Sequence, residues 1–562
     1  MLSLFASNLI STIILFSLGN IFQKIFLKDD LNKLSLFELG IYGFIFLSFI
    51  ALIINFILPL NKFVGDILFF FLIIYFFKIY IKFSNKKELN KLLFFVTIIS
   101  FILIYGSNIN RPDAGLYHLP YISILQENKI ILGITNLHHR FGHTSIVQYI
   151  SAIYNSHFLN IEFINIPLAS LFAFYFYYLI NYFLLNKDLN INKNIFSFFI
   201  ILFSFYAFGR YSNYGNDGPA HLYFFMIIFC LINIKKLHIN ELFKITLFSI
   251  FCFANKASMV ISLIIPIYLF IQSTSNQNLK KLIINRKIIV CAFFLSLLIM
   301  KNILISGCFI YPISKTCING LKFTDIEKTK KIAIEAEAWS KEIRNDQLLK
   351  IPREEYIKNF KWFNGWKKYH FKKIVEKISP LAFFLLIFLI LIIITSRTIP
   401  KVLKSNKSNN LILIISMLLT TIWFIKFPLY RFGMSFIAVL FISLFCILID
   451  QFTINKKENF LKKVGTYFII FALAGLMFKN FKRIYEIKNK EYANYPWPKI
   501  YTLSDLAPNK PKKLKPIYDN KKNLIYYYSS GECMFNQSPC SNYLIQNLKI
   551  ENKNGYKLIY IN

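Results

Sequence analysis

Apolar runs long enough to cross a lipid bilayer recur along the whole 562-residue chain. Leu4–Ile21, Phe37–Leu58 and Ile288–Ile305 are three of them. About 17–25 apolar residues in a helix cross the hydrocarbon core of a membrane. Hydrophobic residues make up 56% of the sequence and its mean hydropathy is +0.49, which excludes an ordinary soluble domain. The sequence therefore predicts an all-α, polytopic membrane protein.

The formal net charge of +37 comes mainly from Lys and Arg in the short segments between apolar runs. Such segments are typical of cytoplasmic turns. Because the basic residues are scattered over these turns, they do not form the basic domain of a nucleic-acid-binding protein, and we expect no nucleic-acid partner. The alternation predicts about 12–14 transmembrane helices in a domain over residues 1–480. We expect both termini outside, with outer loops at 108–160, 209–221 and 306–378.

Two segments need a separate interpretation. The apolar stretch Phe243–Ile271 is interrupted by Asn255 and Lys256, so we expect two short spans that meet near the outer face. A single long span is the alternative, and it would invert the topology of everything that follows. Ser145–Leu159 is only moderately apolar, and we expect an interfacial helix there instead of a span.

The first outer loop contains a polar segment, Asn110–His143, with four of the chain's eight His. Asp113 precedes the sequence Ala-Gly-Leu-Tyr-His. One interpretation makes Asp113 the N-cap of a short helix. The other makes it a catalytic carboxylate at the membrane surface, with Tyr117 and His118 about one turn further on.

A second polar group follows in the same loop, where His138, His139 and Arg140 are consecutive and His143 is close by. These side chains suit contact with lipid headgroups. They also suit anion binding, above all a phosphate held by Arg140. Metal binding by the His residues is a weaker alternative, because adjacent side chains rarely point the same way.

Three further charged residues are candidates for a site. Asp217, in Asn-Asp-Gly-Pro between Arg210 and His221, has turn chemistry. If the two outer loops face each other, Asp113 and Asp217 would share a metal or a substrate hydroxyl. Lys256 and Arg431 either extend toward the membrane surface or neutralise a lipid-linked phosphate.

The eight cysteines divide into two groups. Cys230, Cys252, Cys291 and Cys446 lie in apolar runs and fit small core residues. Two closely spaced pairs, Cys308 with Cys317 and Cys533 with Cys540, fall in regions expected outside, where two disulfides would form. Four free thiols in cytoplasmic loops are the alternative.

The extramembrane segments carry local signals. Thr324-Asp325-Ile326-Glu327 fits a capping box for a helix that continues through Trp339. In the C-terminal region, residues 481–562, Leu524–Tyr528 and Tyr556–Ile561 have strand character, which predicts a small α/β unit. Lys479, Lys482 and Arg483 follow the last span on its expected outer side, against the positive-inside pattern.

The chain resembles a group of bacterial multi-pass membrane proteins of uncharacterised activity that are associated with cell-surface polysaccharide. More loosely, it is similar to the GT-C superfamily of membrane glycosyltransferases, in which an acidic residue follows a span on the outer face and interfacial helices fill the first large outer loop. The matching segments are DAGLYHLP (Asp113–Pro120), TNLHHRFGHTS (Thr135–Ser145), KNILISGCFIYP (Lys301–Pro312), WFIKFPLYRF (Trp423–Phe432) and GECMFNQSPCSNY (Gly531–Tyr543).

The resemblance implies an inverting glycosyltransferase in the bacterial inner (cytoplasmic) membrane, with its active face periplasmic or extracellular. The donor would be a sugar on a polyprenyl phosphate, and the acceptor a glycan or a lipid. Asp113 would be the catalytic carboxylate, acting as general base on an acceptor hydroxyl or helping to hold a divalent metal, and Asp217 a second carboxylate. Arg140, Lys256 and Arg431 would contact the phosphate, and Tyr117, His118, His138 and His139 would complete the site.

Several alternatives stay open at this point. A divalent metal (Mg or Mn) is the one cofactor that the resemblance suggests, yet the first loop lacks the acid pair common in that superfamily. A polysaccharide polymerase or ligase would use the same substrates. A transporter or flippase of lipid-linked glycan would instead need polar groups deep in the spans, and Lys256 fits that alternative best.

Overall fold

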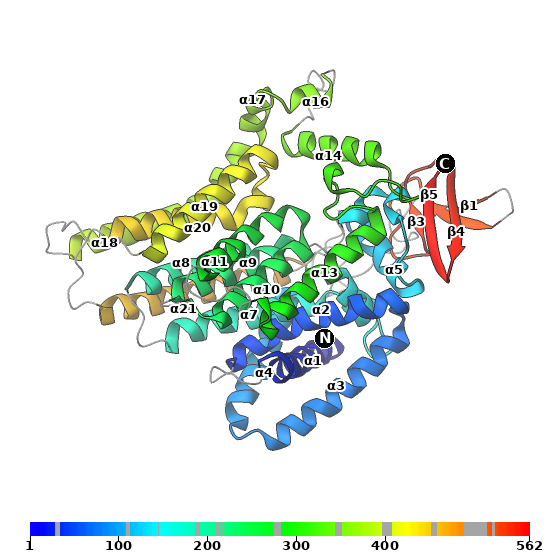
Figure 1. The fold of residues 1–562 in the computed structure, drawn as a ribbon. Helices are drawn as coiled ribbons and strands as arrows, with labels where there is room; N and C mark the ends of the chain where they lie inside the picture. The colour runs from blue at the N-terminus through cyan, green and yellow to red at the C-terminus, as the bar shows by residue number, and fades with distance from the viewer. Residues whose placement is uncertain are drawn as a thin grey trace.

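A computed structural model describes the chain apart from residues 28–33, 108–112, 144, 186–190, 210–213, 215–216, 235–236, 275–282, 343–350, 396–406, 451–457, 488–513 and 520–522. Helices make up most of the described chain, and strands occur only in its last part. Figure 1 shows long helices side by side, with the C-terminal strands at one end of them. Arg210 and many of the expected basic turns lie outside the described residues.

The first helices pack closely because small residues line their contacts. A Cβ atom on Gly19 of α1 would meet the Leu39 carbonyl group of α2, and one on Gly43 would meet that of Leu15. Without side chains at these points, the two backbones approach each other as membrane helices commonly do. The helices of this part are α1 (Leu2–Phe26), α2 (Leu36–Ile57), α3 (Lys62–Lys82) and α4 (Lys86–Ile104).

Buried hydroxyl groups join these helices to the next group. Ser170 of α7 donates a hydrogen bond to Ser11 of α1 (2.9 Å), which also contacts the hydroxyl of Tyr154 (3.0 Å). Such bonds hold apolar helices in register, because their polar groups have few other partners. The second group contains α7 (Ile166–Leu185), α8 (Ile191–Ala207), α9 (Asp217–Asn233), α10 (Ile239–Asn255), η5 (Ala257–Leu263), α11 (Ile264–Thr274) and α13 (Arg286–Ser306).

The helix break predicted at Asn255 and Lys256 is confirmed. Lys256 has extended backbone angles (φ −150°, ψ 123°) directly after α10, and η5 and α11 follow. Ser262 of η5 donates a hydrogen bond back to the Ser249 carbonyl oxygen of α10 (3.5 Å). The chain therefore reverses at Lys256, and the alternative of one long helix is excluded.

The remaining helices lie within or after the expected loop 306–378. Helix α14 begins after Asp325, whose carboxylate accepts a hydrogen bond from the Lys328 N–H (2.8 Å). The N-cap is thus Asp325, one residue later than the capping box predicts, and the predicted helix through Trp339 is confirmed. These helices are α14 (Ile326–Ser340), α16 (Arg353–Tyr356), α17 (Phe363–Trp366), η7 (Lys367–Phe371), α18 (Lys372–Thr395), α19 (Lys407–Lys426), α20 (Tyr430–Asp450) and α21 (Glu458–Ile487).

The membrane class of the protein follows from these helices. Among the described residues, eight helices are long and apolar enough to cross a membrane, and three shorter apolar helices accompany them. Each of the segments expected to span is helical. The protein is therefore an all-α, multi-pass membrane protein with a small C-terminal strand region.

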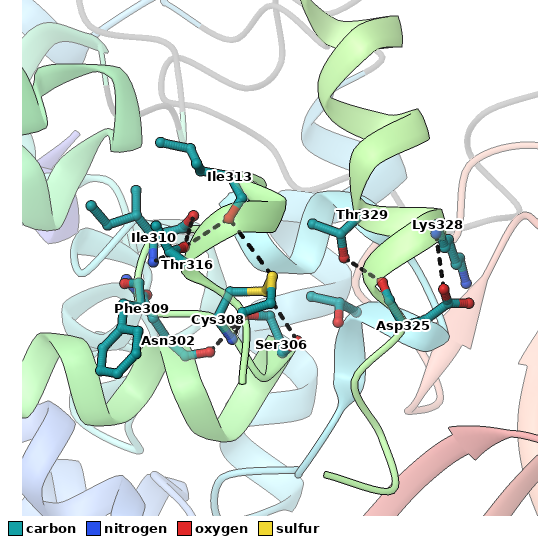
Figure 2. Close-up of a disulfide and its surroundings, with 12 residues drawn as sticks. Asn302, Ser306, Cys308, Phe309, Ile310, Ile313, Thr316, Asp325, Lys328 and Thr329 are labelled. Atoms are coloured by element: carbon teal, nitrogen blue, oxygen red, sulfur yellow. Dashed lines mark hydrogen bonds between the residues drawn. A yellow bond between two sulfur atoms is a disulfide. The ribbon is translucent and has the colours of Figure 1, made fainter. Parts of the chain in front are cut away.

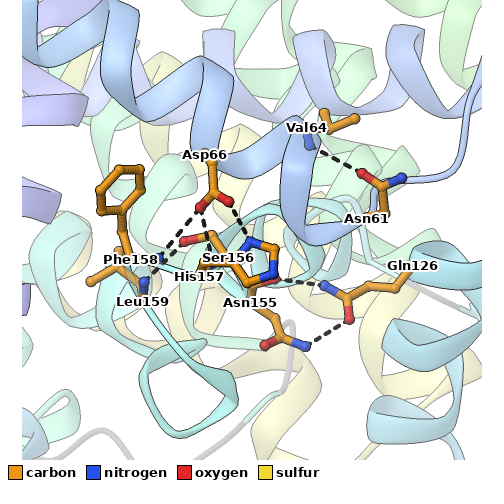
Figure 3. Close-up of polar contacts among 9 residues, drawn as sticks. All are labelled: Asn61, Val64, Asp66, Gln126, Asn155, Ser156, His157, Phe158 and Leu159. Carbon is orange, nitrogen blue, oxygen red and sulfur yellow. Dashed lines mark hydrogen bonds and ion pairs between the residues drawn. The ribbon is translucent and has the colours of Figure 1, made fainter.

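Short helices lie between α4 and α7, where the sequence predicts helices that do not span. They are η1 (Ala114–His118), α5 (Leu119–Glu127), η2 (Ile134–Asn136), η3 (His139–His143), α6 (Val147–Tyr154) and η4 (Ile161–Phe163). With eight residues, α6 is too short to span. Figure 3 shows how the end of this loop is attached to α3, where Asp66 accepts hydrogen bonds from the backbone of His157 (2.9 Å) and Phe158 (3.4 Å).

The tail forms two small sheets, and the strands predicted at Leu524–Tyr528 (β2) and Tyr556–Ile561 (β5) are confirmed. β1 (Lys515–Tyr518) pairs antiparallel with β2, which pairs parallel with β3 (Cys540–Ser541). β4 (Leu548–Lys553) pairs antiparallel with β5. The described tail residues contain no helix after α21, so the expected α/β unit is built of strands in this part of the chain.

The tail packs on the short helices between α4 and α7, beside α5 in Figure 1. The Met534 N–H donates to the Gly115 carbonyl oxygen (2.9 Å), and Ser541 donates to that of Leu137 (3.0 Å). A Cβ atom on Gly115 would lie 2.2 Å from the Glu532 carboxylate. A glycine at position 115 is therefore what lets the tail approach the segment that follows Asp113.

One of the three basic residues that follow Tyr467–Phe478, Arg483, has a structural explanation. Helix α21 continues to Ile487, and Arg483 donates hydrogen bonds to the carbonyl oxygens of Ile102 (2.9 Å) and Tyr105 (2.7 Å) at the end of α4. A cation at the C-terminus of a helix is stabilised by the unpaired carbonyl groups there. Arg483 thus caps the C-terminus of α4. The positive-inside pattern does not take such capping into account.

Both predicted disulfides are present, linking Cys308 to Cys317 and Cys533 to Cys540. Figure 2 shows the first of them, directly after α13. The other four cysteines are free, and all of them are buried except the partly exposed Cys230.

Removing the first disulfide should destabilise the protein. A cross-link over nine residues contributes about 2–3 kcal/mol in the chain-entropy model. We expect the double variant Cys308→Ser/Cys317→Ser to unfold at a lower temperature in detergent than the wild type. The variant Cys230→Ala, which removes a thiol outside both disulfides, should keep the wild-type midpoint. Equal midpoints for the wild type and the double variant would contradict this role.

Candidate functional site

Asp113 does not cap a helix with its side chain. Its backbone angles are already helical (φ −58°, ψ −31°), and its carboxylate makes no capping hydrogen bond to η1. Instead, Oδ1 accepts a hydrogen bond from Arg140 Nη1 at 2.7 Å. The two side chains are 41% and 37% exposed. Asp113 thus occupies the N-cap position of η1, as one interpretation predicts, but its side chain forms a partly exposed ion pair and makes no cap.

Arg140 is positioned by its own loop and by Tyr117. Its guanidinium carbon lies 5.1 Å from the centre of the Tyr117 ring, and its backbone N–H donates to Nδ1 of His138 (3.1 Å). Burial, with a smaller effect of Asp113, raises the pKa of the Tyr117 hydroxyl. Tyr117 therefore stays protonated and can donate a hydrogen bond beside the ion pair.

The four histidines of the segment Asn110–His143 are neutral. Burial lowers the pKa of His118 and His139 to about 4 and that of His138 and His143 to about 3. Their ring contacts fit this state, since His138 and His139 lie 4.9 and 5.7 Å from the Tyr543 ring of the tail. The expected basic cluster thus carries its positive charge on Arg140.

These histidines should make stability depend on pH. In the unfolded chain each His binds a proton below about pH 6.5, whereas the folded protein keeps them neutral down to about pH 4. Their contribution to the free energy of unfolding is fully present above pH 6.5. It is lost as the pH falls below that value, by at most about 1.4 kcal/mol for each His and each pH unit.

We therefore expect the unfolding midpoint of the purified protein to fall between pH 7 and pH 4.5. The midpoint should fall less steeply with decreasing pH in the variants His118→Gln and His138→Gln. A midpoint that is constant over this range would show that these groups titrate normally.

Asp217 lies at the start of a helix and not in a turn. It is the first residue of α9, with Pro219 in the same turn, a position where proline and an acidic side chain are both favoured. Its carboxylate forms an ion pair with the Nζ of Lys256 at the break after α10. The Lys256 side chain is 10% exposed and the Asp217 side chain 34%. Lys256 therefore does not extend to the membrane surface but neutralises Asp217.

Arg431 adds a second cation next to this pair. His221, one turn after Asp217, donates a hydrogen bond to the Arg431 carbonyl oxygen (2.8 Å) and accepts one from Ser435 (2.8 Å). The Arg431 guanidinium lies over the rings of Phe432 (5.1 Å) and Trp339 (5.4 Å). The Nζ of Lys256 lies over the same Phe432 ring, 3.6 Å from its centre.

The two ion pairs belong to one neighbourhood. Asp113, Asp217, Arg140 and Arg431 all act on the pKa of Tyr117 and of His118 through their charges. Arg140 and Lys256 likewise act on His143. The structure thus brings together the predicted acids and cations from segments that are up to 318 positions apart in sequence, Asp113 to Arg431.

A pocket beside these pairs contains a residue that sequence analysis missed. Lys256 and Lys301 both line it, and Lys301, in the candidate span α13, is 3% exposed. The signal was present, because Lys301 is the single charged residue in the apolar run Ile288–Ile305 and an ionisable residue within a span indicates a functional site. The other lining residues are Gly142, His143, Phe253, Ala254, Ala257, Leu298, Asn302 and Tyr311.

The disulfide loop forms one wall of this pocket. Tyr311, between Cys308 and Cys317, packs its ring against Gly142, where a Cβ atom would lie 2.4 Å from it. The ring of His143 lies 5.2 Å from the Tyr311 ring. The cross-link therefore holds the segment that brings Tyr311 to the pocket.

The donor set does not suit a divalent metal. In the described parts of the chain, no three His, Cys, Asp or Glu side chains come together as ligands. Asp113 and Asp217 are each paired with a cation, and a Mg²⁺ site needs carboxylates directed at the metal. We therefore derive no step through Mg²⁺ or Mn²⁺.

Comparison with known proteins gives a family for the chain. A family model described as "Domain of unknown function (DUF8201)" matches residues 1–438. The matched region contains Asp113, Asp217, Lys256 and Arg431 and ends before the tail. No curated protein and no solved structure matches the chain. Because the match covers well over half of its length, the chain belongs to the DUF8201 family.

Proposed function

We propose that the protein is a membrane glycosyltransferase with a GT-C-like arrangement. It transfers a sugar from a polyprenyl-phosphate carrier to a glycan or lipid acceptor in the assembly or modification of cell-surface glycan. The observation that carries the proposal is the gathering of two carboxylates and four cations, Arg140, Lys256, Lys301 and Arg431, beside one pocket at the end of the apolar helices.

The chemistry needs both kinds of group. The acceptor hydroxyl oxygen attacks the anomeric carbon of the sugar and passes its proton to Asp113, the more exposed of the two acids. The bond between that carbon and the phosphate oxygen breaks, and the phosphate leaves with the bonding electrons. Attack from the side opposite the phosphate inverts the anomeric carbon.

The cations stabilise the leaving group. The charge that develops on the phosphate oxygen is met by fixed positive groups, and such electrostatic stabilisation is commonly the largest single contribution to catalysis. Lys256 and Lys301 line the pocket, and Arg431 is held beside it by Trp339 and Phe432. The pocket is therefore the proposed position of the phosphate, and Asp217 holds Lys256 in place there.

A host strain that lacks this protein tests the proposal. We expect its surface glycan, analysed by mass spectrometry and linkage analysis, to lack one sugar or linkage while the rest of the structure remains. A polymerase or ligase would instead change the chain length or attachment of the glycan. An unchanged surface glycan would overturn the proposed function.

Transport of a lipid-linked glycan is a second candidate. It is favoured by the helix break at Lys256 and by the burial of Lys301 within α13. A transporter predicts loss of the whole glycan unit from the surface, with the complete lipid-linked unit accumulating in the membrane. A glycosyltransferase predicts accumulation of the single lipid-linked sugar.

A further inference from the structure

The segment 360–373, which we call the basic-aromatic segment, has two different sides. On the inner side, Trp362 and Trp366 are buried against α14 and α19. The Trp366 indole N–H donates to the Pro428 carbonyl oxygen (2.7 Å). The other side carries large exposed rings and lysines, namely Phe360, Lys361, Phe363, Lys367, Lys368, Tyr369, Phe371, Lys372 and Lys373.

The position of this segment places it at a membrane surface. η7 continues directly into α18, and the candidate span that includes α18 covers Phe363–Leu391. Rings and long cationic side chains at the end of a span lie at the depth of the lipid headgroups. The exposed rings, 39–57% accessible, thus have apolar and headgroup contacts available to them.

The positive charge of the segment does not fit the side of the membrane on which the sequence predicts it. Residues 361–377 contain six Lys and a single acidic residue, Glu376. This end of α18 is the end next to the candidate site, because Trp339 of the adjoining α14 covers Arg431. The positive-inside pattern would put such a cluster on the opposite face from the one where the site is expected. A surface this basic therefore calls for an anionic partner at the headgroup level.

We propose that the exposed side of the basic-aromatic segment binds anionic phospholipid headgroups. Each Lys near an anionic surface contributes by attraction to the phosphate groups, and the exposed rings insert at the same depth. The inner contacts connect this binding to the site, since Ser340 at the end of α14 donates a hydrogen bond to the Lys426 carbonyl oxygen (3.4 Å) close to Arg431. The inference does not depend on the proposed glycosyl transfer.

Tryptophan fluorescence reports on this binding without a label. Four of the five Trp residues, at positions 339, 362, 366 and 423, lie in or next to the segment. The full-length protein is placed in phosphatidylcholine nanodiscs that contain one-fifth brominated phosphatidylglycerol or the same share of brominated phosphatidylcholine. We expect the anionic brominated lipid to quench about twofold more than the neutral one.

A matched pair of variants locates the effect. The variant Lys367→Gln/Lys368→Gln/Lys372→Gln/Lys373→Gln should quench equally with both lipids. The control Lys78→Gln/Lys82→Gln/Lys86→Gln/Lys87→Gln removes four exposed lysines at the far ends of α3 and α4 and should keep the preference. Raising the salt to 0.5 M should weaken the preference of the wild type, which tests the charge without a variant.

Equal quenching of the wild type by both lipids at low salt would overturn the proposal. So would a preference that survives in the segment variant, because the anionic lipid would then be bound elsewhere. If the segment binds another protein and not lipid, the wild type would be quenched equally by both lipids.

Discussion

Asp113→Asn should lower glycosyl transfer by roughly 10²–10⁴-fold, which is the contribution of a general base. An amide keeps the shape of the side chain and can still accept the hydrogen bond from Arg140, but it cannot take up the proton of an acceptor hydroxyl. The readout is the surface glycan of a host strain that carries the variant as its only copy. We expect the glycan to match that of a strain without the protein.

The protein level of this variant should be normal. A partly exposed ion pair such as Asp113–Arg140 contributes only about 0–1 kcal/mol to stability. Asp66→Asn is the matched control, because Asp66 is also an acid but its hydrogen-bond partners are His157 and Phe158 and none of the site cations (Figure 3). If Asp113→Asn left the glycan intact at a normal protein level, Asp113 would not be the base.

Asp217→Asn should destabilise the protein by about 3 kcal/mol, the lower part of the range for breaking a buried ion pair. The variant leaves Lys256, whose side chain is only 10% exposed, without its anionic partner. We place the effect in the lower part of the range because the Asp217 side chain is 34% exposed. Unfolding by sodium dodecyl sulfate in mixed micelles measures the difference.

The double variant Asp217→Asn/Lys256→Met distinguishes the stability contributed by the ion pair from that contributed by each residue alone. It removes both charges, so we expect it to be more stable than Asp217→Asn alone. It should nevertheless fail to restore the surface glycan, because Lys256 lines the proposed phosphate pocket. Strictly additive losses of stability in the two single variants and the double variant would show that the ion pair is not coupled.

Much of the fold could be predicted from sequence because a bilayer constrains it strongly. The expected spans are helices, the chain reverses at Lys256, and the strands at Leu524–Tyr528 and Tyr556–Ile561 are present. Each of these follows from a local pattern, such as the length of an apolar run or alternation along a strand. The two disulfides followed from their spacing together with the topology.

The residues of the site could be predicted from the sequence, but their ion-pair partners could not. Asp113 and Asp217 each had a local explanation, a helix cap and a turn. Asp113 does stand at the N-cap position of η1, but its side chain makes no capping bond, and Asp217 begins a helix. Their partners Arg140 and Lys256 come from other segments, so that only the packing of distant helices determines the pairs. The neutral state of His138 and His143 likewise depends on burial, which a polar sequence does not indicate.

The position of the tail was also beyond sequence analysis. Its contact with Gly115 depends on the absence of a side chain there, which one sequence alone does not connect to Met534, some 400 positions away. The contact places the tail directly beside Asp113. The tail therefore belongs to the surroundings of the site, although the sequence suggested a separate unit.

Release of the lipid carrier by the purified protein tests the central claim most directly. Detergent-solubilised protein is incubated with lipids and glycan extracted from a host strain that lacks it, and free polyprenyl phosphate or diphosphate is measured by mass spectrometry. Micelles have no two sides, so transport cannot produce this signal. We predict release with the wild type and with Asp66→Asn, and at least 100-fold less with Asp113→Asn. Folded wild-type protein that releases no carrier, or Asp113→Asn that releases it at the wild-type rate, would contradict the account.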